Sequence, residues 1–204
     1  MANLTKRSRI IGLGILTVAV LLLALNFAIE RSSPSVPANY NSLLNSLVRL
    51  YRGELGFRLT GDAVTTPVSD WSFTDAVPTV QIETRTWYLI PHSVRTYIAR
   101  NGAQLYLFSE YFAPEPGQPD LRDRFPEARF WNRMVVRDAR IRLKIGNRLF
   151  QMRAYPLTDP SEMAVARQAF LSKYADVRKQ QELPESRRPK LYFFRLEPRW
   201  NDSP

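Results

Sequence analysis

The fold is decided by residues 140–155, RIRLKIGNRLFQMRAY, in which two alternating stretches flank the pair Gly146-Asn147. Apolar and polar residues alternate with the period of two expected of a half-buried β-strand. A two-residue turn at Gly146-Asn147 would pair Ile145 with Arg148 and bring the apolar residues of both arms to one side. The sequence therefore predicts an antiparallel hairpin with one apolar face and one basic face.

The basic face of this hairpin is the predicted partner-binding surface. Its cations are Arg140, Arg142, Lys144 and Arg153. Two interpretations remain open: a solvated face matched by acids elsewhere, or a face docked on lipid or on an acidic protein.

Further extended segments indicate a mainly antiparallel sheet around the hairpin. Asn101-Gly102 predicts a tight turn, because Asn-Gly favours the positive φ angles of a type I′ turn. The predicted strands are residues 79–85, 87–99, 103–109 and 190–198.

Two helices are predicted beside the sheet. One spans residues 126–137, after a loop over 110–124. The other begins at Asp159 as N-cap, with Pro160 at the first position and Glu162 returning to the cap. Strands that come mostly as hairpins, with few helices, indicate an α+β fold on an antiparallel sheet that could close into a small barrel.

The N-terminal part predicts a membrane anchor. Residues 10–29, IIGLGILTVAVLLLALNFAI, carry no charge. At about 1.5 Å per residue, a helix of this length matches the roughly 30 Å hydrocarbon core of a bilayer. Lys6, Arg7 and Arg9 precede it, so the positive-inside rule places the N-terminus in the cytoplasm. A cleaved signal peptide, which would have a shorter apolar region, is the alternative.

The predicted organisation has four parts. A basic cytoplasmic tail spans 1–9, a single transmembrane helix 10–29, a linker with a short amphipathic helix 30–69, and a split-barrel domain 70–204. The predicted location is the inner membrane, with the C-terminal domain in the periplasm. The short helix is expected within residues 39–54, packed on the domain or lying on the membrane or a partner.

Composition excludes several functions. The chain has no cysteine and one histidine, which excludes disulfides and thiolate chemistry and disfavours zinc sites, so we expect no metal. The formal net charge of +10 favours anionic lipid or acidic proteins over nucleic acid for a chain anchored in a membrane. His92-Ser93 is the most enzyme-like pair, yet no triad accompanies it, so a structural role is expected and no catalytic residue is predicted.

One stretch of the chain resembles the flavin-binding split-barrel family, which includes pyridoxamine-phosphate oxidases and deazaflavin-dependent nitroreductases. The resemblance extends over about residues 70–198, with residues 70–73 and 81–85 similar to the opening strand of a membrane-associated branch. The motifs that carry it are Trp131-Asn132, residues 137–146, Leu149-Phe150, Arg153-Ala154, residues 158–162 and residues 170–174.

The resemblance implies a homodimer with FMN or a deazaflavin at the subunit interface. The residues that would hold the flavin are Arg85, Arg95, Arg129, Trp131 and Arg133. The family's hydroxyl-and-lysine or Gly-rich phosphate cradle is missing from the sequence, and the loop over 113–119 carries prolines and acids instead. Trp87, Tyr88, Tyr97 and Tyr106 are expected to build the barrel and dimer contacts, with a stacking platform for a flavin as the alternative.

These observations lead to three hypotheses. The first is a membrane-anchored, non-catalytic accessory or assembly subunit that binds an integral-membrane partner or a second copy, with no cofactor. The alternative is an FMN- or deazaflavin-dependent oxidoreductase. A third is a heme or lipid-ligand binder, in which His92 would be the single imidazole ligand.

Overall fold

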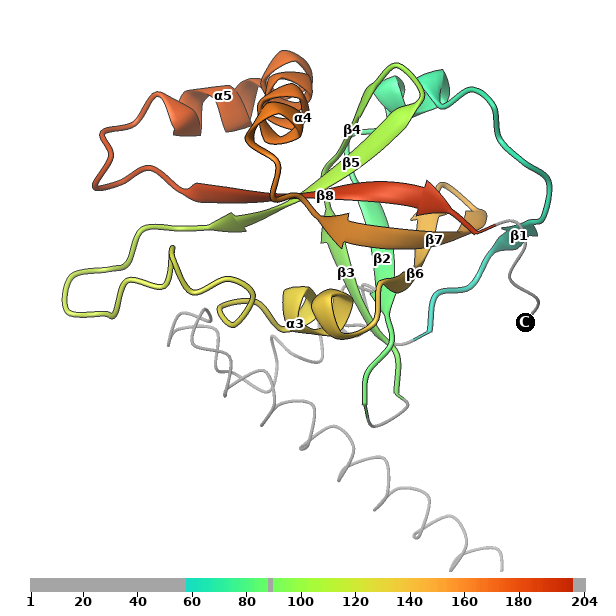
Figure 1. Ribbon diagram of the computed structural model, residues 1–204, viewed down its shortest axis with the longest axis horizontal. Coiled ribbons are helices and arrows are strands. Elements are labelled where there is room, and N and C mark those ends of the chain that lie inside the picture. The colour runs from blue at the N-terminus through green and yellow to red at the C-terminus, as the bar shows by residue number, and fades with distance from the viewer. Residues whose placement is uncertain (1–57, 88–89, 200–204) are drawn as a thin grey trace, which may run out of the picture.

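The computed structural model describes residues 58–87 and 90–199 (Figure 1). The predicted tail, transmembrane helix and amphipathic helix, and Tyr88, lie outside these residues. In the part described, no helix is long and apolar enough to cross a membrane. The elements in chain order are β1 (Asp62–Val64), η2 (Ser72–Ala76), β2 (Val80–Thr84), β3 (His92–Thr96), β4 (Ile98–Asn101), β5 (Gln104–Tyr111), α3 (Phe130–Arg137), β6 (Arg140–Ile145), β7 (Arg148–Pro156), α4 (Pro160–Lys173), α5 (Ala175–Gln181) and β8 (Lys190–Pro198).

The strands form one curled sheet. Their order is β3-β2-β6-β7-β8-β5-β4, and every neighbouring pair on this path is antiparallel. β3 and β4, at the two ends of the order, are separated by Tyr97 alone, so consecutive segments of chain form both edges and the sheet curls back on itself. The prediction of an α+β fold with flanking helices is confirmed for these residues, and the antiparallel sheet forms a half-barrel.

The hairpin of β6 and β7 has the predicted register. Ile145 pairs with Arg148, and Leu143 pairs with Phe150. Gly146 has a φ of 60°, a left-handed conformation that glycine adopts without steric cost. Because side chains alternate between faces, this register buries Leu143 and Phe150 completely inside the barrel.

The interior of the barrel is filled by the inward residues of the strands and by Trp71, which follows β1. The ring centroid of Trp71 lies 5.2 Å from that of Phe150. The other fully buried residues of this core include Val80, Ile82, Ile98, Leu105, Leu107, Ile141, Met152, Val135 and Phe194.

A second layer covers part of the outside. Helices α4 and α5 lie on one side of the sheet, opposite α3 (Figure 1). Phe170 of α4 is fully buried, and its ring centroid lies 4.7 Å from that of Phe108 on β5 and 5.9 Å from that of Phe193 on β8. β5 and β8 therefore bury side chains on both faces, as continuous apolar runs predict.

Local boundaries differ from the sequence predictions at several points. Asn101 pairs with Gln104, so the turn consists of Gly102 and Ala103, one residue later than predicted. The predicted helix over 126–137 begins at Phe130. Asp159 caps α4 as predicted, accepting from the Ser161 amide at 2.7 Å. The carboxylate returning to the cap is not observed. Glu162 instead pairs with Arg195 at 3.0 Å.

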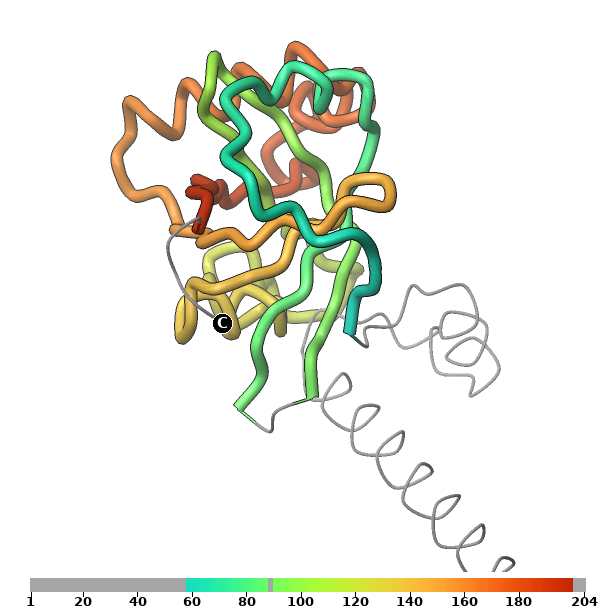
Figure 2. Tube along the Cα trace, turned by 90° about the vertical axis from the view of Figure 1, so that its right-hand side faces the viewer, coloured from blue at the N-terminus to red at the C-terminus, as the bar shows by residue number. Residues whose placement is uncertain are grey.

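The first strand lies within residues 30–69, which the sequence predicts to be linker and helix. β1 runs parallel to β7, with Asp62 opposite Arg148 and Val64 opposite Phe150. It occupies the edge of β7 before β8 begins to pair with that strand at Met152. Figure 2 shows the segment from residue 58 to η2 running along the outside of the barrel.

Candidate functional site

Helix α3 closes one end of the barrel. β4 pairs with β5 from Asn101 to Ile98, which lies opposite Leu107, and the Thr96 hydroxyl then donates to the Phe108 carbonyl oxygen at 2.9 Å. Among the described strands, β3 does not pair with β5, so the two edges of the sheet separate after Thr96 and Phe108. Helix α3 packs there against β2, β3 and β7. The helix therefore fills the seam of the split barrel.

The inward side of α3 is aromatic. Trp131 is 7% exposed, and its ring centroid lies 4.8 Å from that of Phe194. The ring of Phe130 lies 4.8 Å from the imidazole of His92, edge to face, and the Arg133 guanidinium lies 5.3 Å from the same phenyl ring. His92 thus belongs to an aromatic contact between β3 and α3.

A buried polar group ties α3 to the end of β5. The amide nitrogen of Asn132 donates to the Ser109 hydroxyl at 3.0 Å and to the Tyr111 hydroxyl at 2.9 Å. Burial raises the pKa of Tyr111 to about 12, so the phenol stays protonated at neutral pH. These bonds fix the rotation of α3 relative to the sheet.

Glu110 and Arg129 form a buried contact beside this group. The Arg129 guanidinium donates to the Glu110 carbonyl oxygen from Nε at 3.1 Å and from Nη2 at 2.5 Å. Burial raises the pKa of Glu110 to about 7 and lowers the pKa of Arg129. In the part of the chain described, the Oε1 atom of Glu110 is buried and has no hydrogen-bond partner.

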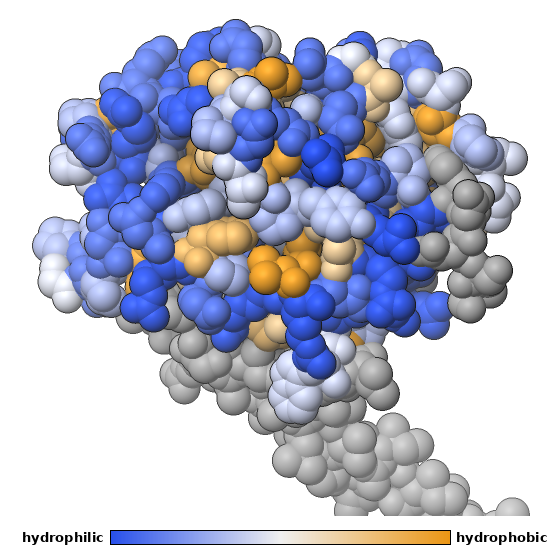
Figure 3. Space-filling model, viewed as in Figure 1, coloured by the Kyte–Doolittle hydropathy of each residue, from blue (hydrophilic) through white to orange (hydrophobic). Residues whose placement is uncertain are grey.

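The outward surface at this end combines large apolar and cationic side chains. Trp87, on the connection between β2 and β3, is 63% exposed, and Val136 on α3 is 51% exposed. Arg137 lies next to Val136 and is exposed, as is Arg85. Figure 3 shows apolar side chains emerging among hydrophilic ones over α3 and the neighbouring strands.

Asp138, directly after α3, forms ion pairs with two arginines at this end of the barrel. Its carboxylate accepts from Arg140 Nε at 2.8 Å and from Nη2 at 2.7 Å, and Arg85 approaches to 3.9 Å. These hydrogen bonds, chiefly those from the Arg140 side chain, hold the pKa of Asp138 below its usual range. One carboxylate therefore faces two arginines, and the balance of charge remains positive.

The five residues expected to hold a flavin occupy different environments. Trp131 is in the core, Arg129 is committed to a carbonyl oxygen, and Arg133 stacks on Phe130. Arg95 pairs with Gln81 across β2 and β3. Gln81 precedes Arg85 by four residues, so Arg95 and Arg85 are separated by about 13 Å along the strand direction. Within the described residues they do not converge on one anion-binding cradle, so the arrangement does not fit a flavin phosphate held by this set.

The predicted basic face exists, but one of its cations is withdrawn from the surface. Arg142 pairs with Glu83, its Nε lying 3.0 Å from Oε1. The backbone of Leu59 completes the contact: its N–H donates to Glu83, and its carbonyl oxygen accepts from Arg142. This clamp fixes the chain ahead of β1 on the sheet, and it leaves Lys144 and Arg153 with half-buried side chains beside it.

Sequence reasoning missed Glu83 as the partner of Arg142. The available signal was a lone acid on the outward positions of β2, but only the pairing of β2 with β6 sets Glu83 opposite Arg142. Sequence reasoning also missed the exposure of Val136, because a valine in a short helix is usually predicted to be buried in the core.

Comparisons with known proteins give a likeness of shape without a family. No family model and no curated protein matches the chain. Similar solved structures include Atu2129 from Agrobacterium tumefaciens, a protein of unknown function, with 16% identity and a TM-score of 0.42 over 66% of this chain and 58% of that one. HutZ, the heme storage protein from Vibrio cholerae, has 11% identity and a TM-score of 0.44 over 62% and 85%.

A FAD-binding protein from Mesorhizobium loti has 16% identity and a TM-score of 0.38 over 62% of this chain and 84% of that one. All three identities are below 25% and all three TM-scores are below 0.5. Likenesses at this level support no conclusion about activity, so the functional argument depends on the residues of this chain.

Proposed function

We propose that the protein is a non-catalytic accessory domain held at a membrane, with the α3 end of the barrel against the bilayer. The observation that carries the proposal is the exposed pair Trp87 and Val136 among the arginines of that end. Tryptophan favours the headgroup region, where its ring is apolar and its N–H remains hydrated. Arginine attracts anionic lipid, and its stem lies along apolar surface.

The sequence supplies a second support. Residues 10–29 are predicted to span a membrane, and β1 begins at Asp62, about thirty residues further along the chain. A membrane span so near to β1 in the sequence would hold the barrel close to the lipid surface, so that each interfacial contact forms at high effective concentration. Even weak binding by Trp87 and Val136 would then orient the barrel.

The test uses the full-length protein in lipid nanodiscs that contain brominated phospholipids. Bromine quenches tryptophans that enter the lipid, and the chain has four tryptophans, of which Trp71 and Trp131 are buried. We expect quenching in the wild type that is largely lost in Trp87→Phe and unchanged in Trp71→Phe. Equal quenching in the wild type and Trp87→Phe would reject the orientation.

The predicted topology is part of the proposal and has its own test. Lys6, Arg7 and Arg9 favour a cytoplasmic N-terminus and a periplasmic barrel. We expect protease added to spheroplasts, whose outer membrane has been removed, to cleave the exposed loop over residues 113–119, whereas the same protein in inverted inner-membrane vesicles is protected. Cleavage in the reverse pattern would place the barrel in the cytoplasm.

A flavin- or deazaflavin-dependent oxidoreductase is the second candidate. One similar structure is named a FAD-binding protein and another an F420-H2-dependent reductase, each at a TM-score below 0.5. An absorption spectrum of the detergent-purified protein decides between the candidates. Stoichiometric flavin or deazaflavin absorbance, together with reduction of an acceptor, would overturn the non-catalytic role.

A further inference from the structure

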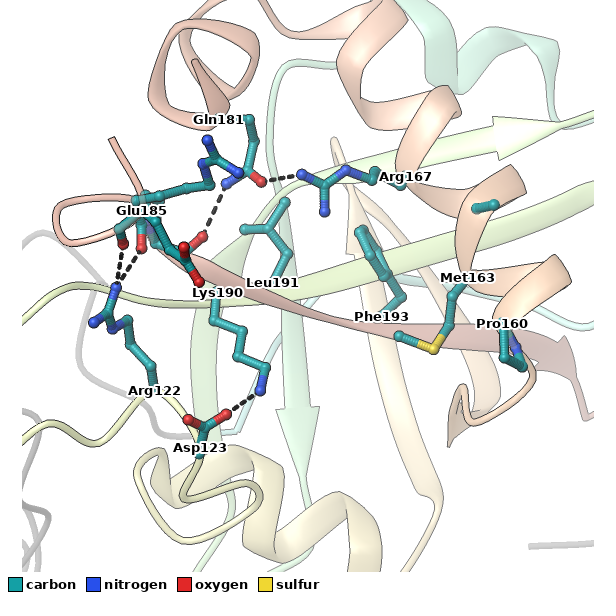
Figure 4. A pocket seen from close by; sticks show the side chains of 13 residues that line it. Arg122, Asp123, Pro160, Met163, Arg167, Gln181, Glu185, Lys190, Leu191 and Phe193 are labelled. Atoms are coloured by element: carbon teal, nitrogen blue, oxygen red, sulfur yellow. Dashed lines mark hydrogen bonds and ion pairs between the residues drawn. The ribbon is translucent and has the colours of Figure 1, made fainter. Parts of the chain in front are cut away.

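A second candidate site lies outside the barrel, on the side covered by helices. It is an open cavity of about 670 Å³ between α4, the start of β8 and two loops (Figure 4). Small-molecule sites typically have volumes of about 300–1,000 Å³, so the size suits a small ligand. Helix α4 contributes one of its faces, with Pro160, Met163, Ala164 and Arg167 spaced at three and four residues.

The walls of this cavity are fixed by Arg122. Its Nη1 donates to the carbonyl oxygens of Glu185 at 2.7 Å and Arg188 at 3.1 Å, while its other nitrogens bind Asp120. The loop after β5 is thus joined to the loop after α5 by a side chain whose position is set at both ends. The cavity is preformed, so a ligand would not have to order these loops.

The floor is apolar. Leu191 and Phe193, from the start of β8, are buried at the base, and Met163 borders them from α4 (Figure 4). Pro189 is buried beside Leu191. An acyl chain or an aromatic ring on this floor would remove further apolar surface from water.

Two arginines of the lining lack a carboxylate partner within the described residues. Arg167 makes a single hydrogen bond, from Nη2 to the side-chain oxygen of Gln181. Arg188 makes one from Nε to the Leu183 carbonyl oxygen at 3.0 Å. Both are half-buried, and each retains guanidinium donors that no described group accepts.

The other charges of the lining are mostly neutralised. Lys190 pairs with Asp123, and Arg122 pairs with Asp120. The remaining acid, Glu185, has an exposed side chain on the loop at the rim. The unneutralised charge inside the cavity is therefore positive and comes from Arg167 and Arg188.

We propose that this cavity binds a single-chain amphipathic carboxylate, such as a medium-chain fatty acid. The carboxylate would accept hydrogen bonds from Arg167 and Arg188, and the chain would lie on Met163, Leu191 and Phe193. Arginine suits this ligand because its planar fork matches the two oxygens of a carboxylate. The site is separate from the α3 end, so it stands independently of the proposed function.

Octanoate is a suitable probe, because it is soluble and carries both features of the ligand. Saturation-transfer NMR on the full-length protein in nanodiscs measures its affinity, with empty nanodiscs as the blank. We expect Arg167→Gln with Arg188→Gln to weaken binding at least tenfold, and octanol, which lacks the charge, to bind at least tenfold more weakly than octanoate. Lys179→Gln, which removes an exposed charge of α5, should leave the affinity unchanged.

A matched pair of tryptophan variants tests the location. Ala164→Trp would fill the cavity, whereas Val165→Trp places the same side chain on the next exposed position of α4, outside the lining. We expect Ala164→Trp to abolish octanoate binding and Val165→Trp to retain it. Equal octanoate affinity in these two variants, or a wild-type signal no greater than that of empty nanodiscs, would overturn the proposal.

Discussion

Two outward faces of one sheet have opposite surroundings. The outward residues of β5 and β8 include Tyr106, Phe108 and Phe193, which pack under α4 and α5. Those of β6 are Arg140, Arg142 and Lys144, and Arg142 binds the segment at Leu59. The difference is visible in the strands themselves. β5 (QLYLFSEY) and β8 (KLYFFRLEP) have apolar residues at both inward and outward positions. In β6 (RIRLKI) the apolar residues are all inward and the charged ones all outward. A second layer forms where the outward positions of the strands are also apolar, because only there does a helix bury apolar surface by packing on the sheet.

The largest effect expected from breaking this comparison is at Phe170. Phe170→Ala removes the side chain that joins α4 to Phe108 and Phe193, and it should lower the free energy of unfolding by about 3–5 kcal/mol. Urea unfolding of the detergent-solubilised full-length protein measures the loss. The matched control is Val165→Ala on the exposed side of α4, where a loss as large as that of Phe170→Ala would argue against the second layer.

The next effect tests the clamp on the charged face. Glu83→Gln leaves Arg142 half-buried without a counter-charge, and it should cost about 2–4 kcal/mol of unfolding free energy. Because a buried pair replaced by apolar residues is often neutral, Glu83→Leu combined with Arg142→Met should recover at least half of the loss. If Glu83→Gln alone were as stable as the wild type, the ion pair between Glu83 and Arg142 would not be what holds Leu59 on the sheet.

A third prediction concerns pH on the covered side. The pKa of Glu110 is raised from 4.5 to about 7 by burial, so between these values the native state holds the proton more tightly than the unfolded state. Stability from this group is greatest below pH 4.5 and is lost as the pH rises through 7. Glu110→Gln should therefore be more stable than the wild type above pH 7, by about 1–3 kcal/mol, and should lose this advantage near pH 4.5.

Unfolding at pH 4.5, 6 and 8 measures this dependence. Glu182→Gln, at an exposed position after α5, removes the same charge and is the control for the change in net charge. Parallel profiles for Glu110→Gln and the wild type would show that folding does not change the pKa of Glu110.

The smallest effect is expected at Arg140 on the charged face. Its pair with Asp138 is bidentate but 45% of the Arg140 side chain is exposed, so Arg140→Gln should change the free energy of unfolding by less than about 1 kcal/mol. Thermal unfolding at low and high salt measures it, and the small difference should shrink as salt is added. A loss comparable to that of Glu83→Gln would mean that exposure does not separate these two ion pairs.

The elements of the barrel follow from local sequence. Residues 140–155 predicted a hairpin and its register, because a slip by one residue would move every apolar side chain to the outside. The last strand was predicted with its observed bounds, Lys190–Pro198, and Asp159 was predicted as the cap of α4. These features depend on residues that are close together in the sequence, so the sequence alone is enough to predict them.

The sites depend on contacts between distant residues, and the sequence could not supply them. Glu83 meets Arg142 only because β2 pairs with β6, and Arg167 of α4 lines the same cavity as Arg188 only because the loop after α5 lies beside α4. Trp131 was expected at a flavin and lies in the core. Periodicity determined which face of each strand is apolar, and tertiary pairing decided which charges are neutralised, because a Coulomb interaction or a hydrogen bond requires a particular neighbour whereas burial requires only an apolar one.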